Sequence, residues 1–418
     1  MLKKVYIVSI LVLLSNSLCF SMSYDNRYFP LLQRPFFKTV EKPSNFMGNA
    51  FIFTGDKAFN KHGNDKNSDG TDYSAMEFFG KYDQSTVADA MVEAGILDTS
   101  PLGHWSSVGK ILWDAQQKVR AQGASFAFDK SLNKNWSFGF SCFVMNLNSD
   151  VEFSLSKDAD SSFPLQGDRD EIERIRFNMN NLLGIEGEQY GTAGLGDFDF
   201  YVQYGLLREY FLKCKKVDMG LRLGLLMPLG TVTNNDCPTS LPFGGNGHWG
   251  VYFGTNSEFE LKEDLSVGVI LRLISRFEKK EERRLPSQGE VPMYAALLGD
   301  VKIVPGLTTV VSPYFVFNDI RDGLGLQLRY TFVHHSRDHW ADCRVNKSVQ
   351  TKFSDVEEYS AWSSEYASVN VFYDFSQLEE GATFAPTFSF EWDIPINFLA
   401  SYQFNKTHRI SLGVGFSF

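Results

Sequence analysis

Hydrophobic and polar residues alternate along residues 191–231 with a period of two. This period is typical of β-strands whose two faces meet different surroundings. In a membrane barrel the apolar face meets lipid and the polar face lines the lumen, whereas the polar face of a soluble sandwich faces water. One face of the second half carries Val217, Met219, Leu221, Leu223 and Leu225, and the other carries Asp218, Gly220, Arg222 and Gly224.

The same pattern recurs through most of the chain, and short turns separate some strands while long polar loops separate others. Long loops are expected at 157–190, 232–247 and 334–364. This asymmetry is typical of outer-membrane barrels. We therefore predict an all-β fold, a transmembrane antiparallel β-barrel of about 12–16 strands, with 14 as the favoured number. Further strands are expected at 46–54, 73–82, 124–129, 136–142, 248–261, 265–277, 291–304, 307–317, 324–333, 366–375, 384–392 and 410–418.

Residues 1–21 have the pattern of a cleaved secretory signal peptide. Lys3 and Lys4 precede a short apolar run, Val5–Leu14, which is too short for the ~20 residues of a spanning helix. Residues 22–122 form a partly helical N-terminal segment with the first strands and loop helices, or a plug in the lumen. Helices are expected at 85–96 and 106–122, and the main barrel strands at 123–418.

The C-terminal stretch Ser411–Phe418 resembles the assembly signal of bacterial outer-membrane proteins. Its signal residues are Gly413, Phe416 and the terminal Phe418. We expect this strand to pair with the first one, because a barrel in lipid leaves no open edge. The resemblance implies the barrel-assembly machinery and outer-membrane lipid as partners, and the outer membrane of a Gram-negative-type bacterium as the location.

Composition supports export and a barrel. Aromatic residues make up 15% of the chain, Phe alone accounts for 38 residues, and no later stretch holds ~18 uninterrupted apolar residues. The net charge of −10 argues against a nucleic-acid partner.

Two short motifs frame the 191–231 stretch, Gly194-Leu195-Gly196-Asp197 and Pro228-Leu229-Gly230-Thr231. They resemble the GxGD…PxG pattern of the "MetA-pathway of phenol degradation" barrels, which are similar to FadL-like hydrocarbon and fatty-acid transporters. The resemblance covers about 40 residues and implies a barrel that moves small molecules passively. The chain departs from FadL-like proteins between residues 22 and 50, where it lacks the Asn-Pro-Ala sequence of their N-terminal plug.

Charged residues on the polar faces are candidates for the lumen wall. Three arginines would form a basic patch that attracts anions, or would pair with lumen carboxylates. Pairing is favoured, because confined charges usually need partners. The arginines are Arg222, Arg272 and Arg329, and the carboxylates are Asp197, Asp199, Asp218, Asp374 and Glu391.

Histidines and cysteines give no strong metal motif. His334, His335 and His339 lie near Cys343, but this spacing matches no common zinc site, so we expect a solvated loop and no metal. Cys237 and Cys343 lie in polar loops and can form a disulfide. Four mature cysteines, with Cys142 and Cys214, allow three pairings.

The chain contains no GxSxG, HExxH, P-loop or GxGxxG motif, and we predict no enzymatic activity and no cofactor. The predicted function is passive transport of small solutes through an outer-membrane barrel. The alternative is a barrel that serves as an adhesin or surface scaffold. A rim-located hydrolase is a third, less favoured reading.

Overall fold

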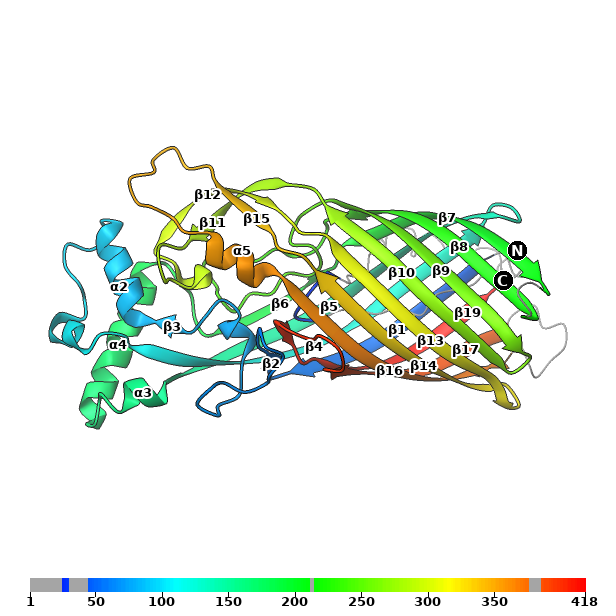
Figure 1. The fold of residues 1–418 in the computed structure, drawn as a ribbon, viewed down its shortest axis with the longest axis horizontal. Helices are drawn as coiled ribbons and strands as arrows, with labels where there is room; N and C mark the ends of the chain where they lie inside the picture. The colour runs from blue at the N-terminus through cyan, green and yellow to red at the C-terminus, as the bar shows by residue number, and fades with distance from the viewer. Residues whose placement is uncertain (1–24, 30–43, 211–213, 376–384) are drawn as a thin grey trace, which may run out of the picture.

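Twelve strands close into an antiparallel barrel in this computed structural model, which describes residues 25–29, 44–210, 214–375 and 385–418 (Figure 1). Twelve lies within the predicted range and is two fewer than the favoured fourteen. Nearly all neighbours in the ring are also consecutive barrel strands in the sequence, and β1 pairs with both β4 and β19. In order, the strands are β1 (Ser44–Gly55), β4 (Leu112–Ser131), β5 (Trp136–Leu155), β7 (Phe198–Glu209), β8 (Lys216–Met227), β9 (Gly250–Lys262), β10 (Leu265–Arg276), β13 (Thr308–Arg321), β14 (Leu324–His335), β16 (Trp362–Asp374), β17 (Ala385–Ile396) and β19 (His408–Ser417).

The remaining elements lie in the connections between barrel strands. β3 (Tyr82–Asp83) and β6 (Gln189–Leu195) extend the barrel sheet, while β11 (Lys279–Leu285), β12 (Leu297–Val304) and β15 (His339–Asp342) form a separate sheet, and β2 (Ala58–Phe59) pairs with β18 (Phe404–Asn405). The helices are η1 (Ala75–Glu77), α2 (Gln84–Glu93), η2 (Gly103–Val108), α3 (Lys157–Asp160), α4 (Gln166–Leu182), η3 (Pro292–Tyr294) and α5 (Ser354–Ser360). Among the described residues, no helix is long and apolar enough to cross a membrane.

The two ends of the barrel differ. Short turns such as 132–135, 263–264 and 322–323 join strands at one end, where the C-terminal residue Phe418 lies (Figure 1). Long connections at the other end carry all the helices of the described residues (Figure 1). We refer to these long connections, together with the strand portions that rise among them, as the head.

Backbone hydrogen bonds close the ring between the first and last strands. Ser44 N donates to Phe418 O and Phe418 N donates to Ser44 O, each at 2.9 Å. A Cβ at position 413 would lie 2.2 Å from Asn49 Oδ1 on β1, so glycine is needed where β19 passes β1. The predicted pairing of the C-terminal strand with the first strand is therefore observed.

The alternation of β5 reverses its sense halfway along the strand. Near the short turns its outward residues are apolar and its inward residues are polar, as lipid and lumen require. Towards the head the outward residues are polar and the inward residues are apolar, as in a soluble protein. The outward set runs Trp136, Phe138, Phe140, Val144, Asn146, Asn148 and Glu152, and the inward set runs Ser137, Ser141, Phe143, Met145, Leu147 and Val151.

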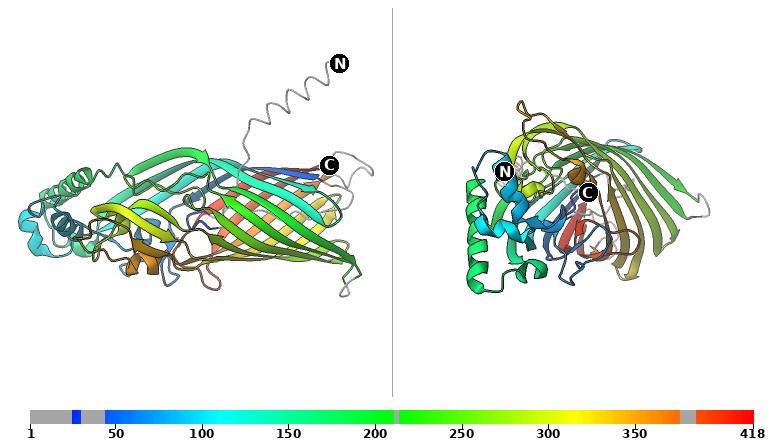
Figure 2. Two further views of the ribbon diagram at one scale, coloured as in Figure 1. Left: turned by 90° about the horizontal axis from the view of Figure 1, so that it is seen from above. Right: turned by 60° about the vertical axis from the view of Figure 1, so that its left-hand side comes forward.

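This reversal marks the level at which the barrel leaves the membrane. β4 and β5 each contain 20 residues, which is about 65 Å at ~3.3 Å per residue, whereas a tilted membrane strand needs ~9–11 residues. The outer half of each strand thus rises into the head (Figure 2). Apolar cores fill the head, one of them around Phe51, Phe53, Phe143 and Phe243.

The structure corrects three predicted elements. The predicted helix 106–122 is wrong beyond η2, which ends at Val108. From Trp113 the chain pairs with β5 and from Val119 also with β1, and this tertiary pairing overrides the helix propensity of Gln116–Gln122. Residues 73–82 hold η1 instead of a strand. Residues 291–304 contain β12, which lies in the separate sheet. The connection from β10 to β13 is therefore one long loop, which places loop 334–364 on the same side as loop 157–190. The helix at 85–96 is confirmed as α2, and the signal peptide lies outside the described residues.

Candidate functional site

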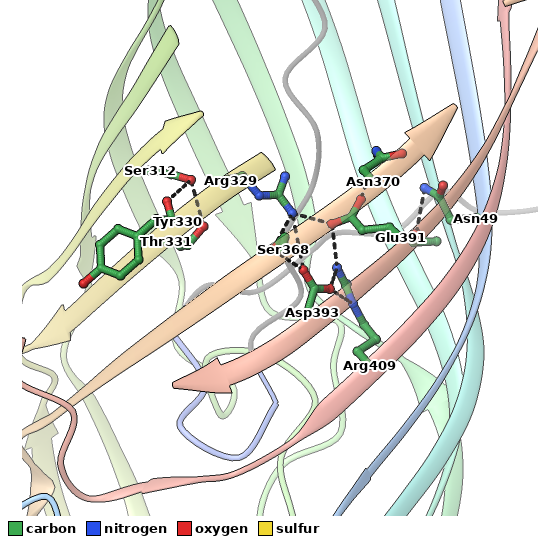
Figure 3. A network of polar contacts seen from close by, with 11 residues as sticks. Asn49, Ser312, Arg329, Tyr330, Thr331, Ser368, Asn370, Glu391, Asp393 and Arg409 are labelled. Carbon is green, nitrogen blue, oxygen red and sulfur yellow. Dashed lines mark hydrogen bonds and ion pairs between the residues drawn. The ribbon is translucent and has the colours of Figure 1, made fainter. Parts of the chain in front are cut away.

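A network of ion pairs crosses the lumen wall on β14, β16, β17 and β19 (Figure 3). Arg329 contacts Glu391 and lies 3.5 Å from Asp393, while Arg409 lies 2.5 Å from Asp393 and 3.6 Å from Glu391. Ser368 Oγ donates to Asp393 at 2.5 Å. All five side chains are buried, so two guanidinium groups and two carboxylates neutralise one another away from solvent.

Two further groups on the opposite part of the wall repeat one arrangement of carboxylate, tyrosine and arginine. Tyr252 OH donates to Asp199 at 2.8 Å, and Arg272 lies 3.9 Å above the Tyr252 ring and 3.4 Å from Asp199. Likewise, Tyr201 OH donates to Asp129, and Arg222 lies 3.8 Å above the Tyr201 ring.

Glycines make room for these tyrosines. A Cβ at position 224 would lie 2.1 Å from the Tyr252 ring, and one at position 139 would lie 2.5 Å from the Tyr201 ring. The rings therefore lie flat against the wall, which brings their hydroxyl groups within reach of the carboxylates.

A fourth charge group lies at the mouth of the barrel, at the level of the reversal. Arg276 lies 2.5 Å from Asp25 and 2.7 Å from Asp197, and it also donates to His248 O at 2.6 Å. Asp197 further accepts from Gly245 N at 2.8 Å. We refer to Asp25, Asp197 and Arg276 as the mouth triad.

The two sequence motifs meet at the mouth triad. Asp197 ends the first motif, and Gly230 in the second approaches Phe243 so closely that a Cβ there would lie 1.7 Å from Phe243 O. This close approach allows loop 243–245 to reach Asp197. The motifs thus have a structural basis in the contact between the β6–β7 bend and the β8–β9 loop.

The predicted lumen charges fall into different places. Arg222, Arg272, Arg329, Asp199 and Glu391 line the wall as described above, and Asp197 lies at the mouth. Asp218 and Asp374 lie towards the short-turn ends of β8 and β16. Sequence reasoning missed several partners, namely Asp25, Asp129, Tyr201, Tyr252, Arg276, Asp393 and Arg409.

A cavity of about 280 Å³ lies above the mouth triad. Its walls are formed by the N-terminal segment 25–28, the β8–β9 loop, the sheet of β11 and β12, and the β14–β16 connection. Polar and charged residues contribute more than half of the lining residues, while apolar atoms contribute most of the exposed lining surface. The lining includes Arg27, Tyr28, Phe79, Met293, Trp340 and Trp362, together with Asp25 and Asp338.

Residues 25–29 are held in the mouth by contacts with distant parts of the chain. Asn26 Nδ2 donates to Pro242 O at 2.9 Å, and Thr407 Oγ1 donates to Tyr28 O at 2.5 Å. Phe29 is buried and stacks on Phe53 with ring centroids 5.0 Å apart. The segment thus forms part of the cavity and part of the apolar core around Phe53 in the head.

The His and Cys residues do not form a metal site among the described residues. His334 and His335 end β14, and His339 begins β15, so the expected loop contains strand ends. Thr308 Oγ1 lies 2.7 Å from His335 Nδ1, and His335 Nε2 lies 3.0 Å from Asp338 Oδ1, which ties loop 336–361 to β13. None of Cys142, Cys214, Cys237 and Cys343 takes part in a disulfide in the described part of the chain, so the Cys237–Cys343 disulfide is not observed.

Glu77 in the head makes the stability of the protein depend on pH. Burial raises the pKa of Glu77 from 4.5 to about 7, although the hydrogen bond from Asn67 opposes this shift. The folded protein therefore holds the Glu77 proton more tightly than the unfolded chain, and stability is lost as pH rises from about 4.5 to about 7. The loss amounts to about 3 kcal/mol.

We expect Glu77→Gln to remove this dependence. The measurement is the urea unfolding midpoint at pH 5 and pH 8, followed by tryptophan fluorescence. The matched control is Glu358→Gln at an exposed carboxylate of the head. An unchanged difference between the two pH values in E77Q would contradict the assignment.

Comparison with known proteins gives matches among solved structures. No family model and no curated protein matches the chain. An outer-membrane channel from Pseudomonas putida F1 is similar at a TM-score of 0.49 and 11% identity, covering 93% of this chain and 100% of that one. A Pseudomonas aeruginosa FadL homologue has a TM-score of 0.32 at 8% identity, covering 90% of this chain and 89% of that one. A mutant of the TodX monoaromatic hydrocarbon channel has a TM-score of 0.38 at 11% identity and 90% coverage of each chain.

The fold defines the class, a transmembrane antiparallel β-barrel with an extended head. With TM-scores below 0.5, the matches do not bear on substrate or mechanism.

Proposed function

We propose that this protein is an outer-membrane channel that passes small solutes passively. The observation that carries the proposal is the cavity of about 280 Å³ at the mouth of a closed twelve-strand barrel. Outer-membrane barrels have short periplasmic turns and long extracellular loops, so the head and this cavity face the cell exterior.

Passage beyond the cavity requires the mouth triad to part. Arg276 and Asp197 are buried, and their ion pairs join the N-terminal segment 25–29 to the barrel wall. Segment 25–29 and the triad together act as the closing element. The charged groups deeper in the lumen are neutralised by their neighbours, which suits the passage of solutes of low charge better than that of free ions.

Solute uptake into proteoliposomes tests the proposal. The purified full-length protein is expected to speed the entry of glycine and arabinose over that of protein-free vesicles, while the larger sugar raffinose stays outside. A folded, heat-modifiable barrel that admits none of these solutes would overturn the proposal and would favour the alternative, a surface scaffold whose working part is the head.

A further inference from the structure

The connection from β17 to β18 presents two large apolar side chains at the outer surface of the protein. Phe398 is 77% exposed and Leu399 is 68% exposed, compared with 50% for Phe388 on the outward face of β17. A single exposed apolar side chain is common on any protein surface. Here two adjacent ones extend from a loop whose backbone is held in place.

The loop folds over a buried carboxylate on the outer face of β16. Glu365 pairs in register with Ile396, so it lies on the same face of the sheet as the outward residues of β17. Glu365 is nevertheless 0% exposed. Its carboxylate accepts hydrogen bonds from Phe398 N at 2.8 Å, from Leu399 N at 2.9 and 3.1 Å, and from Ala400 N. The backbone of the loop therefore satisfies and covers a charge on the outside of the barrel.

Further contacts fix the loop on both sides of its tip. Asn397 Nδ2 donates to Gly63 O at 2.7 Å. After the tip, Ser363 and Tyr402 exchange two backbone hydrogen bonds, each at 3.0 Å. The two apolar side chains are thus presented outward by a loop that four separate strand and loop contacts hold, counting those to Glu365.

The loop lies at the level where the barrel leaves the membrane. On β5 the last apolar outward residue is Val144, and its ladder row reaches β17, four strands away, at Phe390. Strands about 4.8 Å apart with a tilt of about 45° change height by ~3.4 Å from one to the next, so four steps amount to ~14 Å, or about six residues at ~2.3 Å of height each. On β17 the outward residues stay apolar over that distance, through Ile396, and Phe398 follows directly.

We infer that loop 397–400 is a lipid anchor, with Phe398 and Leu399 inserted into the leaflet on the head side of the membrane. Lipid accounts for both features of the loop. Hydrocarbon favours the two apolar side chains, and a carboxylate on the outer face at this level needs cover and hydrogen bonds because it finds no water there. The partner is the hydrocarbon boundary of the bilayer, and this contact is independent of whether the barrel passes solutes.

Quenching of tryptophan fluorescence tests the lipid anchor in the full-length protein, reconstituted in phosphatidylcholine vesicles. Phe398→Trp and Leu399→Trp each add one indole at the loop tip, and the signal of the wild-type protein is subtracted. The matched control is Val345→Trp, at a fully exposed position between β15 and α5. Lipid brominated close to the headgroup is expected to quench the added signal of F398W and L399W at least twofold. Iodide in the buffer should quench V345W strongly and the two loop variants little.

Heat modifiability on an unboiled gel shows that each variant is folded before the measurement, and two reporters guard against the failure of one. Iodide quenching of both loop variants at the level of V345W, with no effect of the brominated lipid, would place the loop in water and overturn the inference. Protection of both loop variants from both quenchers would show that another protein surface covers the loop, and would overturn it as well.

Discussion

Asp393→Ala is expected to lower the stability of the barrel by about 3–5 kcal/mol, because it leaves two buried arginines with a single carboxylate, Glu391, between them. Asp393 is 1% exposed and contacts both Arg329 and Arg409. Removing one member of a buried network costs more than the network contributes as a whole, because the remaining charges stay buried. The measurement is the temperature at which the folded band on an unboiled gel converts to the unfolded band.

A double variant separates the lost ion pair from a simple packing defect. Asp393→Ala combined with Arg409→Ala removes one charge of each sign, and we expect it to recover part of the lost stability. The control Asp374→Ala changes a carboxylate on the neighbouring strand, near the short turns, and should shift the conversion temperature less. If the double variant loses more stability than the two single variants lose together, the result would contradict the network.

Arg276→Gln is expected to open the mouth. The change leaves Asp25 and Asp197 facing each other without the cation that joins them, so segment 25–29 loses its main attachment to β10. If the change lowers the free energy that favours the closed mouth by about 1.4 kcal/mol, the open population rises about tenfold. Arabinose entry into proteoliposomes should therefore rise about tenfold or more.

Arg283→Gln provides the matched control for this change. Arg283 also lines the cavity, but it pairs with Glu281 on its own strand. Its other hydrogen bond goes to Thr233 O, and within the described residues it forms no ion pair or hydrogen bond with segment 25–29. Arabinose entry should stay near the wild-type rate in R283Q. Equal rates in R276Q and the wild type would show that the mouth triad does not limit passage.

The strand faces of the barrel were predictable because alternation is a local property of the sequence. The outward and inward residues of β7 and β10 match the predicted faces, and those of β8 do so except at Val217, which is buried. Arg276 and Asp393 were missed although the pattern could have shown both. Arg276 lies four residues after Arg272 and so on the same strand face, and Asp393 lies one residue beyond the predicted end of its strand.

The partners of the mouth triad could not be predicted from local pattern. Asp25 and Arg276 are 251 residues apart, and the short N-terminal segment has no periodicity that would place it in the barrel. The strand β4 was mistaken for a helix at its start because its outward residues there are polar and good helix formers. A reversal of the alternation within one long strand is the signal that would have shown both the strand and the membrane boundary.

Single-channel recording in planar bilayers tests the central claim most directly, namely that a barrel with neutralised lumen charges is closed at its mouth by the triad. The wild-type protein is expected to give brief, small openings, and R276Q is expected to give long-lived open steps under the same salt conditions. Large, continuously open steps in the wild-type protein, with no change in R276Q, would contradict the account.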